Sequence, residues 1–334
     1  KKLAYRATDG VYFDISKFRG YGKLSRVKQR KLKAGARVSA DEYSKAEARD
    51  FALWKAPKKS LRDSTGQAAK PGEPSWPAPF GRGRPGWHIE CSAMSMKYLG
   101  PTFDIHAGGV DLLFPHHEDA IAQSEGATGR RFVRYFVEGE HLLVDGKKMS
   151  KSLGNVYRLA DLEKRGFEPM DFRYFVLGAH YRKPLNFTGK ALASARQGRI
   201  GLLNAIERIR RGPHASAGHL KDENECLAVI AAAEKQFRAA IDDDLNTPKA
   251  LAVLNEFLHY ANALTDRKLL TARAARLILV TVKEFDRVLG LDLGQRKPAA
   301  VPPQVRKLVA ERESLRKAKR WTEADKIRER IRKL

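Results

Sequence analysis

Cysteine is scarce in this chain, and long apolar runs are absent. Two cysteines, Cys91 and Cys226, occur in 334 residues, too few for a disulfide framework, so we expect a reducing compartment. No stretch approaches the roughly eighteen consecutive apolar residues that suggest a membrane helix, and the start, Lys1-Lys2-Leu3, lacks the apolar core of a signal peptide. We therefore expect a globular intracellular protein without a membrane partner, in the cytoplasm or, as second choice, a mitochondrial or plastid matrix.

Acidic residues are also few. The chain has 39 Asp and Glu and 64 Lys and Arg, which gives a net charge of +25. The excess lies at the two ends: residues 1–82 hold 20 basic against 8 acidic residues, and residues 304–334 hold 12 against 5. The middle, 83–303, is nearly balanced, with 32 against 26. Basic ends around a neutral centre predict two separate contacts with a polyanion such as structured RNA.

The first 140 residues contain two kinds of pattern. Residues 1–82 show short strand patterns with turns, a basic helix-like run over 25–33, and a polar loop that includes 58–69, whose role the sequence does not reveal. Residues 83–140 instead predict a helix over 89–99, a strand over 103–105 and a helix opening at 118–126. Such an alternation is typical of half of a doubly wound α/β sheet.

The remaining chain is mainly helical by its apolar spacing. A strand over 141–145 precedes a lysine-rich loop, and helical structure is predicted from Met170. Apolar residues then recur at steps of three and four in four segments, which predicts a bundle: 202–209, 227–237, 250–264 and 274–289. A linker over 293–303 leads to a basic helix over 304–334, in which we expect Trp321 to pack in a core rather than stack on a base.

Two groups of residues have the chemistry of a binding site. The loop K-M-S-K-S over 148–152 places two lysines and two serines together, and lysine is a mobile point charge suited to a triphosphate. Cys91 and the pair His116 and His117 offer a thiolate and imidazoles, which are zinc ligands. Taken alone, such residues are more often a solvated basic loop, a core thiol and packing histidines.

Five motifs together resemble one family, the cysteinyl-tRNA synthetases of class I. They are G-R-P-G-W-H-I-E-C-S-A-M at 83–94, F-D-I-H at 103–106, D-L-L-F-P-H-H-E at 111–118, K-M-S-K-S-L-G-N at 148–155 and D-D-D-L-N-T-P at 242–248. The resemblance runs from about Gly10 to the last residue and keeps the order of that family.

The resemblance implies an α/β fold with a helical remainder. We expect the second half of a Rossmann-type catalytic domain with an inserted basic α+β domain, followed by an all-α bundle and a basic arm. The expected parts are the inserted domain 1–82, the catalytic half 83–140, the lysine loop with a stem-contact region 141–190, the bundle 191–291 and the tRNA-binding arm 304–334.

The resemblance also implies roles for individual residues. Lys148 and Lys151 are expected to be catalytic, and Trp87 and His106 to bind cysteine. One zinc ion, which would accept the substrate thiolate, is expected on Cys91 and His116. ATP, with magnesium, is expected to lie against the loop and the end of the preceding strand: Gly109, Asp111, Lys148, Ser150, Lys151 and Ser152.

The chain departs from the family pattern at several places. Ala120 stands where the family has a liganding glutamate, so Glu118 or Asp119 is the alternative zinc ligand. Glu138 stands where the family has histidine and would bring negative charge towards a nucleotide pocket. The partner motif H-x-G-H of the amino-terminal half does not occur in these residues. We therefore expect a portion of a longer chain, with a reduced relative as the alternative.

Two functions remain open from the sequence. The first is a cysteine–tRNA ligase that activates cysteine with ATP and transfers it to tRNA(Cys), as a monomer. The second is a noncatalytic, diverged paralogue that binds structured RNA as a component of a ribonucleoprotein, for example one associated with the ribosome. A ligase that joins cysteine to a small amine is disfavoured, because it would not require the helical region and the basic arm.

Overall fold

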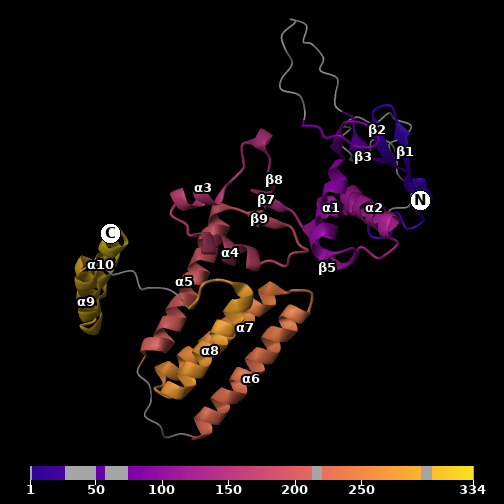
Figure 1. Ribbon diagram of the computed structural model, residues 1–334. Helices are drawn as coiled ribbons and strands as arrows, with labels where there is room; N and C mark the ends of the chain where they lie inside the picture. The colour runs from indigo at the N-terminus through magenta and orange to yellow at the C-terminus, as the bar shows by residue number, and fades with distance from the viewer. Residues whose placement is uncertain (1, 27–49, 57–73, 213–219, 295–302, 334) are drawn as a thin grey trace, which may run out of the picture. The chain divides into compact units, whose positions relative to one another are not determined.

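The computed structural model describes residues 2–26, 50–56, 74–212, 220–294 and 303–333 (Figure 1). The chain divides into two compact units. The first contains Lys1–Tyr157 and Ala179–Thr188, and the second contains Arg158–Gly178 and Gly189–Leu334. The region 141–190, which we expected to be continuous, thus contributes to both units.

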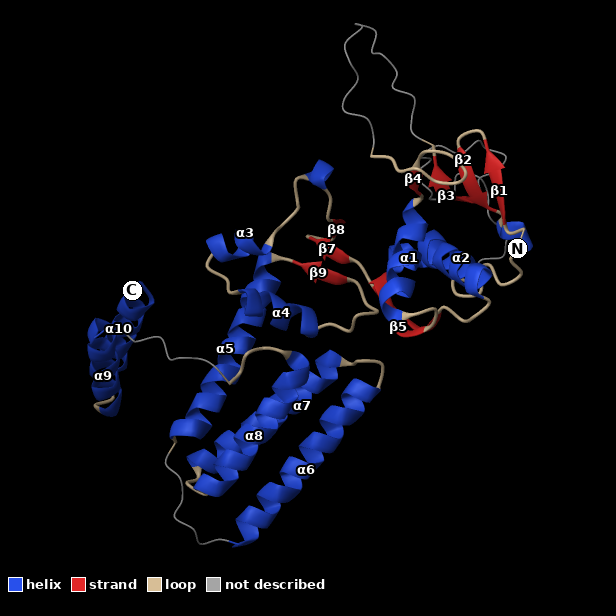
Figure 2. Cartoon of the chain, in the orientation of Figure 1, coloured by secondary structure: helices blue, strands red, loops and turns tan. Residues whose placement is uncertain are grey.

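The amino-terminal part of the first unit is a four-stranded antiparallel sheet (Figure 2). Its strands follow chain order: β1 (Ala4–Ala7), β2 (Gly10–Phe13), β3 (Phe51–Lys55) and β4 (Arg84–Pro85). Phe13, Ile15 and Phe51 form a buried core together with Ala122, which belongs to a later helix. The inserted sheet is therefore anchored on the catalytic half. Most of the basic run 25–33, and all of 58–69, lie outside the described residues.

The catalytic half begins with a helix, a strand and a helix, as predicted, and continues with a second strand that was not predicted. Its elements are α1 (Trp87–Leu99), β5 (Phe103–Gly109), α2 (Glu118–Thr128) and β6 (Val133–Gly139). β5 and β6 pair in parallel, with Gly109 opposite Gly139 at their carboxyl ends. The strand extends beyond the predicted 103–105 because small residues at 107–109 continue the pairing. Gly86 caps α1, and a Cβ there would lie 1.8 Å from the backbone oxygen of Ala52.

Several large apolar side chains of this catalytic half are exposed to solvent. Ile105 and Tyr135, which face each other across the parallel pair, are 63% and 68% exposed. On α1, Met94 and Tyr98 are 55% and 77% exposed. Parallel strands are normally covered on both faces, so we call these four residues the open apolar surface.

The lysine loop belongs to a separate three-stranded sheet in the order β8-β7-β9. β7 (Leu142–Val144) forms a hairpin with β8 (Lys147–Lys148) and pairs in parallel with β9 (Leu185–Phe187). The turn residues Asp145 and Gly146 both have positive φ, 49° and 75°, as a tight hairpin turn requires. The predicted strand over 141–145 is confirmed.

The second unit is helical. Its helices are α3 (Leu159–Lys164), α4 (Pro169–Leu177), α5 (Gly189–Arg211), α6 (Leu220–Asp242), α7 (Thr247–Asp266), α8 (Ala272–Leu289), α9 (Pro303–Lys317) and α10 (Trp321–Lys333). Apolar residues of α5 to α8 form one buried cluster, so the four predicted helical segments do pack as a bundle. Among the described residues, no helix combines the length and the apolar character that crossing a membrane would need.

The basic carboxyl-terminal helix is in fact two helices, α9 and α10. The chain reverses at Lys319, which has a left-handed φ of 57°, and Arg320 pairs with Glu323 in the first turn of α10. No glycine or proline marks this reversal, so the sequence pattern predicted one helix. Trp321 is 56% exposed with the guanidinium of Arg316 6.0 Å from its ring centre, and the prediction of a core tryptophan is wrong.

A buried ion pair joins α4 to α5. The guanidinium of Arg199 donates to Asp171, at 2.8 Å, and to Glu168, and Asp171 is fully buried. Asp171 also accepts the backbone N–H of Glu168 and so caps α4. Arg196 also lies 4.0 Å from Asp171, but its side chain is 43% exposed, so Arg199 is the buried cation of the pair, and its removal is destabilising.

We expect Arg199→Ala to lower the free energy of unfolding of the helical unit by about 3–5 kcal/mol, because the buried Asp171 carboxylate would lose its hydrogen-bonded cation. Denaturant titration followed by circular dichroism measures this. Arg287→Ala is the matched control, since Arg287 pairs with Glu284 on an exposed helix face and should cost less than about 1 kcal/mol. Equal losses in the two variants would contradict a structural role for the buried pair.

Candidate functional site

The carboxyl ends of β5 and β6 collect most of the predicted site residues. Parallel α/β sheets bind ligands at this edge because the loops that follow the strands converge there. The segment 110–117, between β5 and α2, supplies Asp111, His116 and His117. Trp87 and Cys91 come from α1, and His106 comes from β5 itself.

Aromatic rings from these elements form one cluster. His116 lies 4.8 Å from Trp87 and 5.6 Å from His117 between ring centres, and His117 lies 4.7 Å from His106. The structure thus brings together residues that the sequence assigned separately to cysteine and to zinc. It also adds His88, whose ring lies 5.1 Å from that of His116.

Sequence reasoning missed His88 as a member of this cluster, whereas His117 was named beside His116 as an imidazole donor. A signal for His88 existed, since it directly follows Trp87 in the first motif. What the sequence could not give is the contact between the two segments. The Nδ1 atoms of His88 and His116 lie 2.9 Å apart, so one ring donates and the other accepts.

The imidazoles of the cluster favour the neutral form. Burial, together with neighbouring imidazoles, lowers the pKa of His88 and of His116 to about 4. Burial also lowers the pKa of His106 and of His117. At neutral pH the cluster can therefore donate and accept hydrogen bonds without carrying positive charge.

Hydrogen bonds between buried polar side chains connect α1 and α2 next to the cluster. The side-chain amide of Gln123 donates to the backbone oxygen of His88 and to Oγ of Ser92, each at 2.7 Å. Ser124 donates to the same Ser92 oxygen at 2.9 Å. Because these groups are buried, they fix which turn of α1 faces α2.

Glu118 is not placed to bind zinc, and its assignment as an alternative ligand is wrong. Its carboxylate is fully buried and accepts hydrogen bonds from the backbone N–H groups of Gly22, Leu24 and Ser25, at 3.0, 2.7 and 2.6 Å, and from the Ser25 hydroxyl. Both of its carboxylate oxygens accept hydrogen bonds from residues 22–25 of the inserted domain. Glu118 is the cap of a loop.

The described residues do not by themselves fit a zinc centre. They contain no group of three His, Cys, Asp or Glu side chains arranged to hold a metal ion. Ala120 is fully buried in an apolar cluster with Ile121 and Phe132, where a carboxylate ligand would have stood. Cys91 and His116 remain as two donors of suitable chemistry, and burial raises the pKa of the Cys91 thiol, which disfavours its metal-binding thiolate.

Gly109 and Asp111 lie together at the end of β5. A Cβ on Gly109 would come within 2.4 Å of the Asp111 carboxylate, so the carboxylate folds back over the strand end. A small residue beside a carboxylate allows close approach of a ribose or another hydroxyl-bearing group.

The lysine loop is folded by its own polar residues. Asn155 accepts from the backbone N–H of Ser150 at 2.8 Å and donates to the backbone oxygen of Lys148 at 3.1 Å. Ser150 also caps the short helical turn Lys151–Leu153. Within the described part of the chain, neither Lys148 nor Lys151 forms a salt bridge, and both are exposed. The loop therefore presents two uncompensated positive charges.

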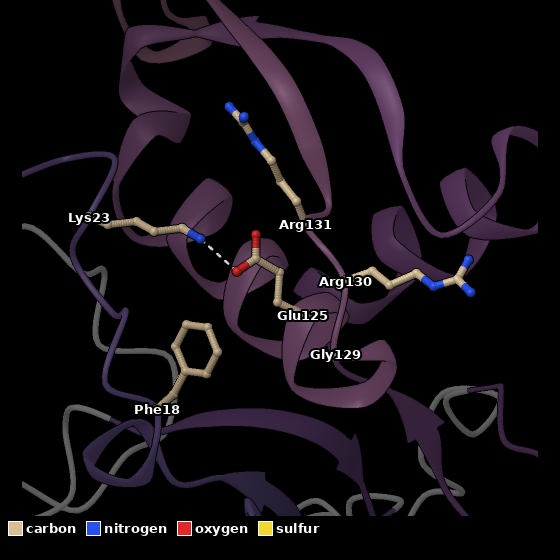
Figure 3. Close-up of a pocket in the computed structure, with 6 residues that line it drawn as sticks. All are labelled: Phe18, Lys23, Glu125, Gly129, Arg130 and Arg131. Carbon is tan, nitrogen blue, oxygen red and sulfur yellow. Dashed lines mark hydrogen bonds and ion pairs between the residues drawn. The ribbon is translucent and has the colours of Figure 1, made fainter.

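A pocket of about 520 Å³ opens at the other end of β6 (Figure 3). It is lined by Phe18, Lys23, Glu125, Gly129, Arg130 and Arg131. Its cations do not converge on one point: Lys23 pairs with Glu125, and Arg131 donates to the backbone oxygens of Val133 and Arg134. They also lie at the carboxyl end of α2, where basic residues offset the helix dipole. We assign no ligand to this pocket.

We expect Glu118→Gln to lower the free energy of unfolding by about 2 kcal/mol or more, because an amide cannot satisfy the several donors that a carboxylate satisfies. Zinc affinity, measured by competition with a chromogenic chelator, should not change. A loss of zinc binding at unchanged stability would restore Glu118 as a ligand.

Two family descriptions match the sequence. Residues 1–197 match "tRNA synthetases class I (C) catalytic domain", and residues 236–294 match "DALR domain". The second match begins near the end of α6 and includes α7 and α8.

Curated relatives match almost the whole chain. Proteins named "Cysteine--tRNA ligase" from Chlamydia felis, Opitutus terrae and Thermococcus gammatolerans are 43%, 45% and 44% identical to it. The matches cover 99%, 99% and 100% of this chain and 67%, 66% and 69% of those proteins. The chain thus spans about two thirds of the length of these relatives. On these matches and on its fold, the chain belongs to the cysteinyl branch of the class I tRNA synthetase family.

Proposed function

We propose that this chain is a cysteine–tRNA ligase, which activates cysteine with ATP and transfers the cysteinyl group to tRNA(Cys). Family membership supports the reaction class. The observation that best supports an active enzyme is the state of the lysine loop. Lys148 and Lys151 are exposed, and neither forms a salt bridge within the described residues.

In the first step the cysteine carboxylate attacks the α-phosphorus of ATP, a new carboxyl–phosphate bond forms, and the bond to the β-phosphate breaks to release pyrophosphate. ATP enters with magnesium as substrate. Lys148 and Lys151 stabilise the charge that accumulates on the departing phosphates, and Ser150 and Ser152 offer hydroxyl donors. In the second step a terminal tRNA hydroxyl takes the cysteinyl group, and AMP leaves.

The aromatic cluster is the proposed cysteine site. Trp87 provides an apolar wall, and His106 provides a neutral polar edge beside it. Gly109 and Asp111, at the end of β5, receive the adenosine. Zinc on Cys91 and His116 would supply a soft Lewis acid for the substrate thiolate, but it would require further ligands from outside the described residues, so no step above depends on it.

The basic ends of the chain are the proposed RNA contacts. Residues 1–82 would approach the acceptor stem, and the bundle with the hairpin α9–α10 would approach the anticodon side. The exposed ring of Trp321 next to Arg316 suits base stacking within a phosphate-binding surface. We place the enzyme inside the cell, in the cytoplasm or an organelle matrix, and propose that it acts as a monomer unless it joins a ribonucleoprotein.

Exchange of pyrophosphate into ATP should depend on cysteine and not on serine. The double variant Lys148→Ala/Lys151→Ala should lower the exchange rate by about 10²–10³-fold, because two charges that stabilise the transition state are lost. Lys147→Ala is the matched control, since Lys147 is the neighbouring exposed lysine of β8. Undiminished exchange in the double variant would refute the role of the loop.

Trp321→Ala should weaken tRNA binding by about fivefold or more, as expected for the loss of one stacked base. Filter binding or fluorescence anisotropy at one fixed salt concentration measures this. Val309→Ala, a substitution at another exposed apolar residue of the same hairpin, should leave the affinity unchanged. Equal affinities of the wild type and Trp321→Ala would remove the base-stacking role.

A second function is favoured by one specific observation, the apolar environment of Ala120 at the expected ligand position. It is a noncatalytic RNA-binding component of a ribonucleoprotein, which would keep the basic ends. Protein purified from its native source that is folded and binds RNA but shows no cysteine-dependent exchange would support this function over the ligase.

A further inference from the structure

The carboxylate of Glu138 forms a hydrogen bond with the ring of His117. Its Oε1 lies 2.7 Å from Nδ1 of His117, and the side chains of Glu138 and His117 are 13% and 1% exposed. The other Glu138 oxygen and Nε2 of His117 have no hydrogen-bond partner within the described residues. The expectation that Glu138 would project negative charge towards the nucleotide therefore requires revision, because this charge is engaged inside the cluster.

The absence of a side chain at Gly108 makes this contact possible. Gly108 stands directly opposite Glu138 in the parallel pairing of β5 and β6. A Cβ on Gly108 would lie 2.6 Å from Cε1 and 2.8 Å from Nε2 of His117, closer than real contacts allow. The imidazole thus rests directly on the strand, beside the carboxylate that binds it.

His117 in turn supports His106. The two rings meet edge to face, with centres 4.7 Å apart and planes at 73°. Phe136, which pairs with His106 in the sheet register, lies 5.4 Å from both rings. Three rings therefore pack together at the strand ends, and a displacement of His117 would remove one support of His106.

We propose that Glu138 is a positioning residue of the cysteine site, which acts through His117 to hold the ring of His106. An ionised carboxylate only accepts hydrogen bonds, so it selects the His117 tautomer with hydrogen on Nδ1. Burial raises the pKa of Glu138; the neighbouring His106 opposes this shift, and Asp111 adds to it. The inference deepens the proposed function and rests on it for the identity of the substrate.

The test compares Glu138→Ala with Glu138→Gln in the full chain. The glutamine keeps an acceptor oxygen at the same distance from the backbone, whereas alanine removes it. Glu140→Ala is the matched control, because the Glu140 carboxylate accepts the backbone N–H of His141 instead. Thermal unfolding establishes that each variant is folded.

Two readouts are needed. Nitrogen-15 NMR of the histidine rings reports the His117 tautomer and the environment of His106 without any substrate. In Glu138→Ala we expect mixed His117 tautomers and shifted His106 signals, and in Glu138→Gln the wild-type pattern. In cysteine-dependent exchange, Glu138→Ala should raise the KM for cysteine about tenfold, with kcat and the KM for ATP changed less than threefold, and Glu138→Gln should restore it.

The outcomes separate this inference from the proposed function. Unchanged histidine spectra in Glu138→Ala, or equal effects on the KM for cysteine and for ATP, overturn the positioning role. Wild-type protein that shows the single tautomer but no exchange overturns the ligase and keeps the contact. Gly108→Ala is an independent variant: it should displace His117 and reproduce the spectrum of Glu138→Ala, and a wild-type spectrum would overturn the inference.

Discussion

The buried carboxylate of Glu118 is the constraint on which the catalytic half depends. It stands at the first turn of α2, where the helix dipole favours negative charge, and it gathers three backbone N–H groups and a hydroxyl from residues 22–25. Next to it, Asp119 accepts the Tyr21 hydroxyl at 2.6 Å. One helix turn therefore ties the inserted domain to the segment that ends in His116 and His117. The cost of burying the charge is offset by these charge-assisted hydrogen bonds.

Most elements were predictable, because apolar spacing records the local periodicity of a helix or strand. The helices of the bundle, α1, α2, α4 and the strand β7 all follow from it. The reversal at Lys319 was not predictable, since a lysine in left-handed conformation leaves no mark in the pattern. The length of β5 was underestimated for a related reason: Ala107, Gly108 and Gly109 favour no strand by themselves, and their pairing with β6 decides the outcome.

The site was predictable in its members more than in its contacts. Trp87, His106 and His116 do share one cluster, but nothing in the sequence placed His88 against His116 or Glu138 against His117. These contacts depend on which turn of α1 faces α2 and on the empty space above Gly108, which are properties of packing. Packing also explains the wrong prediction for Glu118. Its neighbours in sequence suggested a metal ligand, but in the structure its carboxylate contacts backbone N–H groups.

The open apolar surface consists of exposed side chains on β5, β6 and α1. Ile105 and Tyr135 sit on paired strands, and Met94 and Tyr98 on the preceding helix, all well exposed. Exposed apolar side chains next to a parallel strand pair mark a place for packing against another element. Because parallel strands are normally covered on both faces, Ile105 and Tyr135 mark the face of the strand pair on which a further covering element would pack.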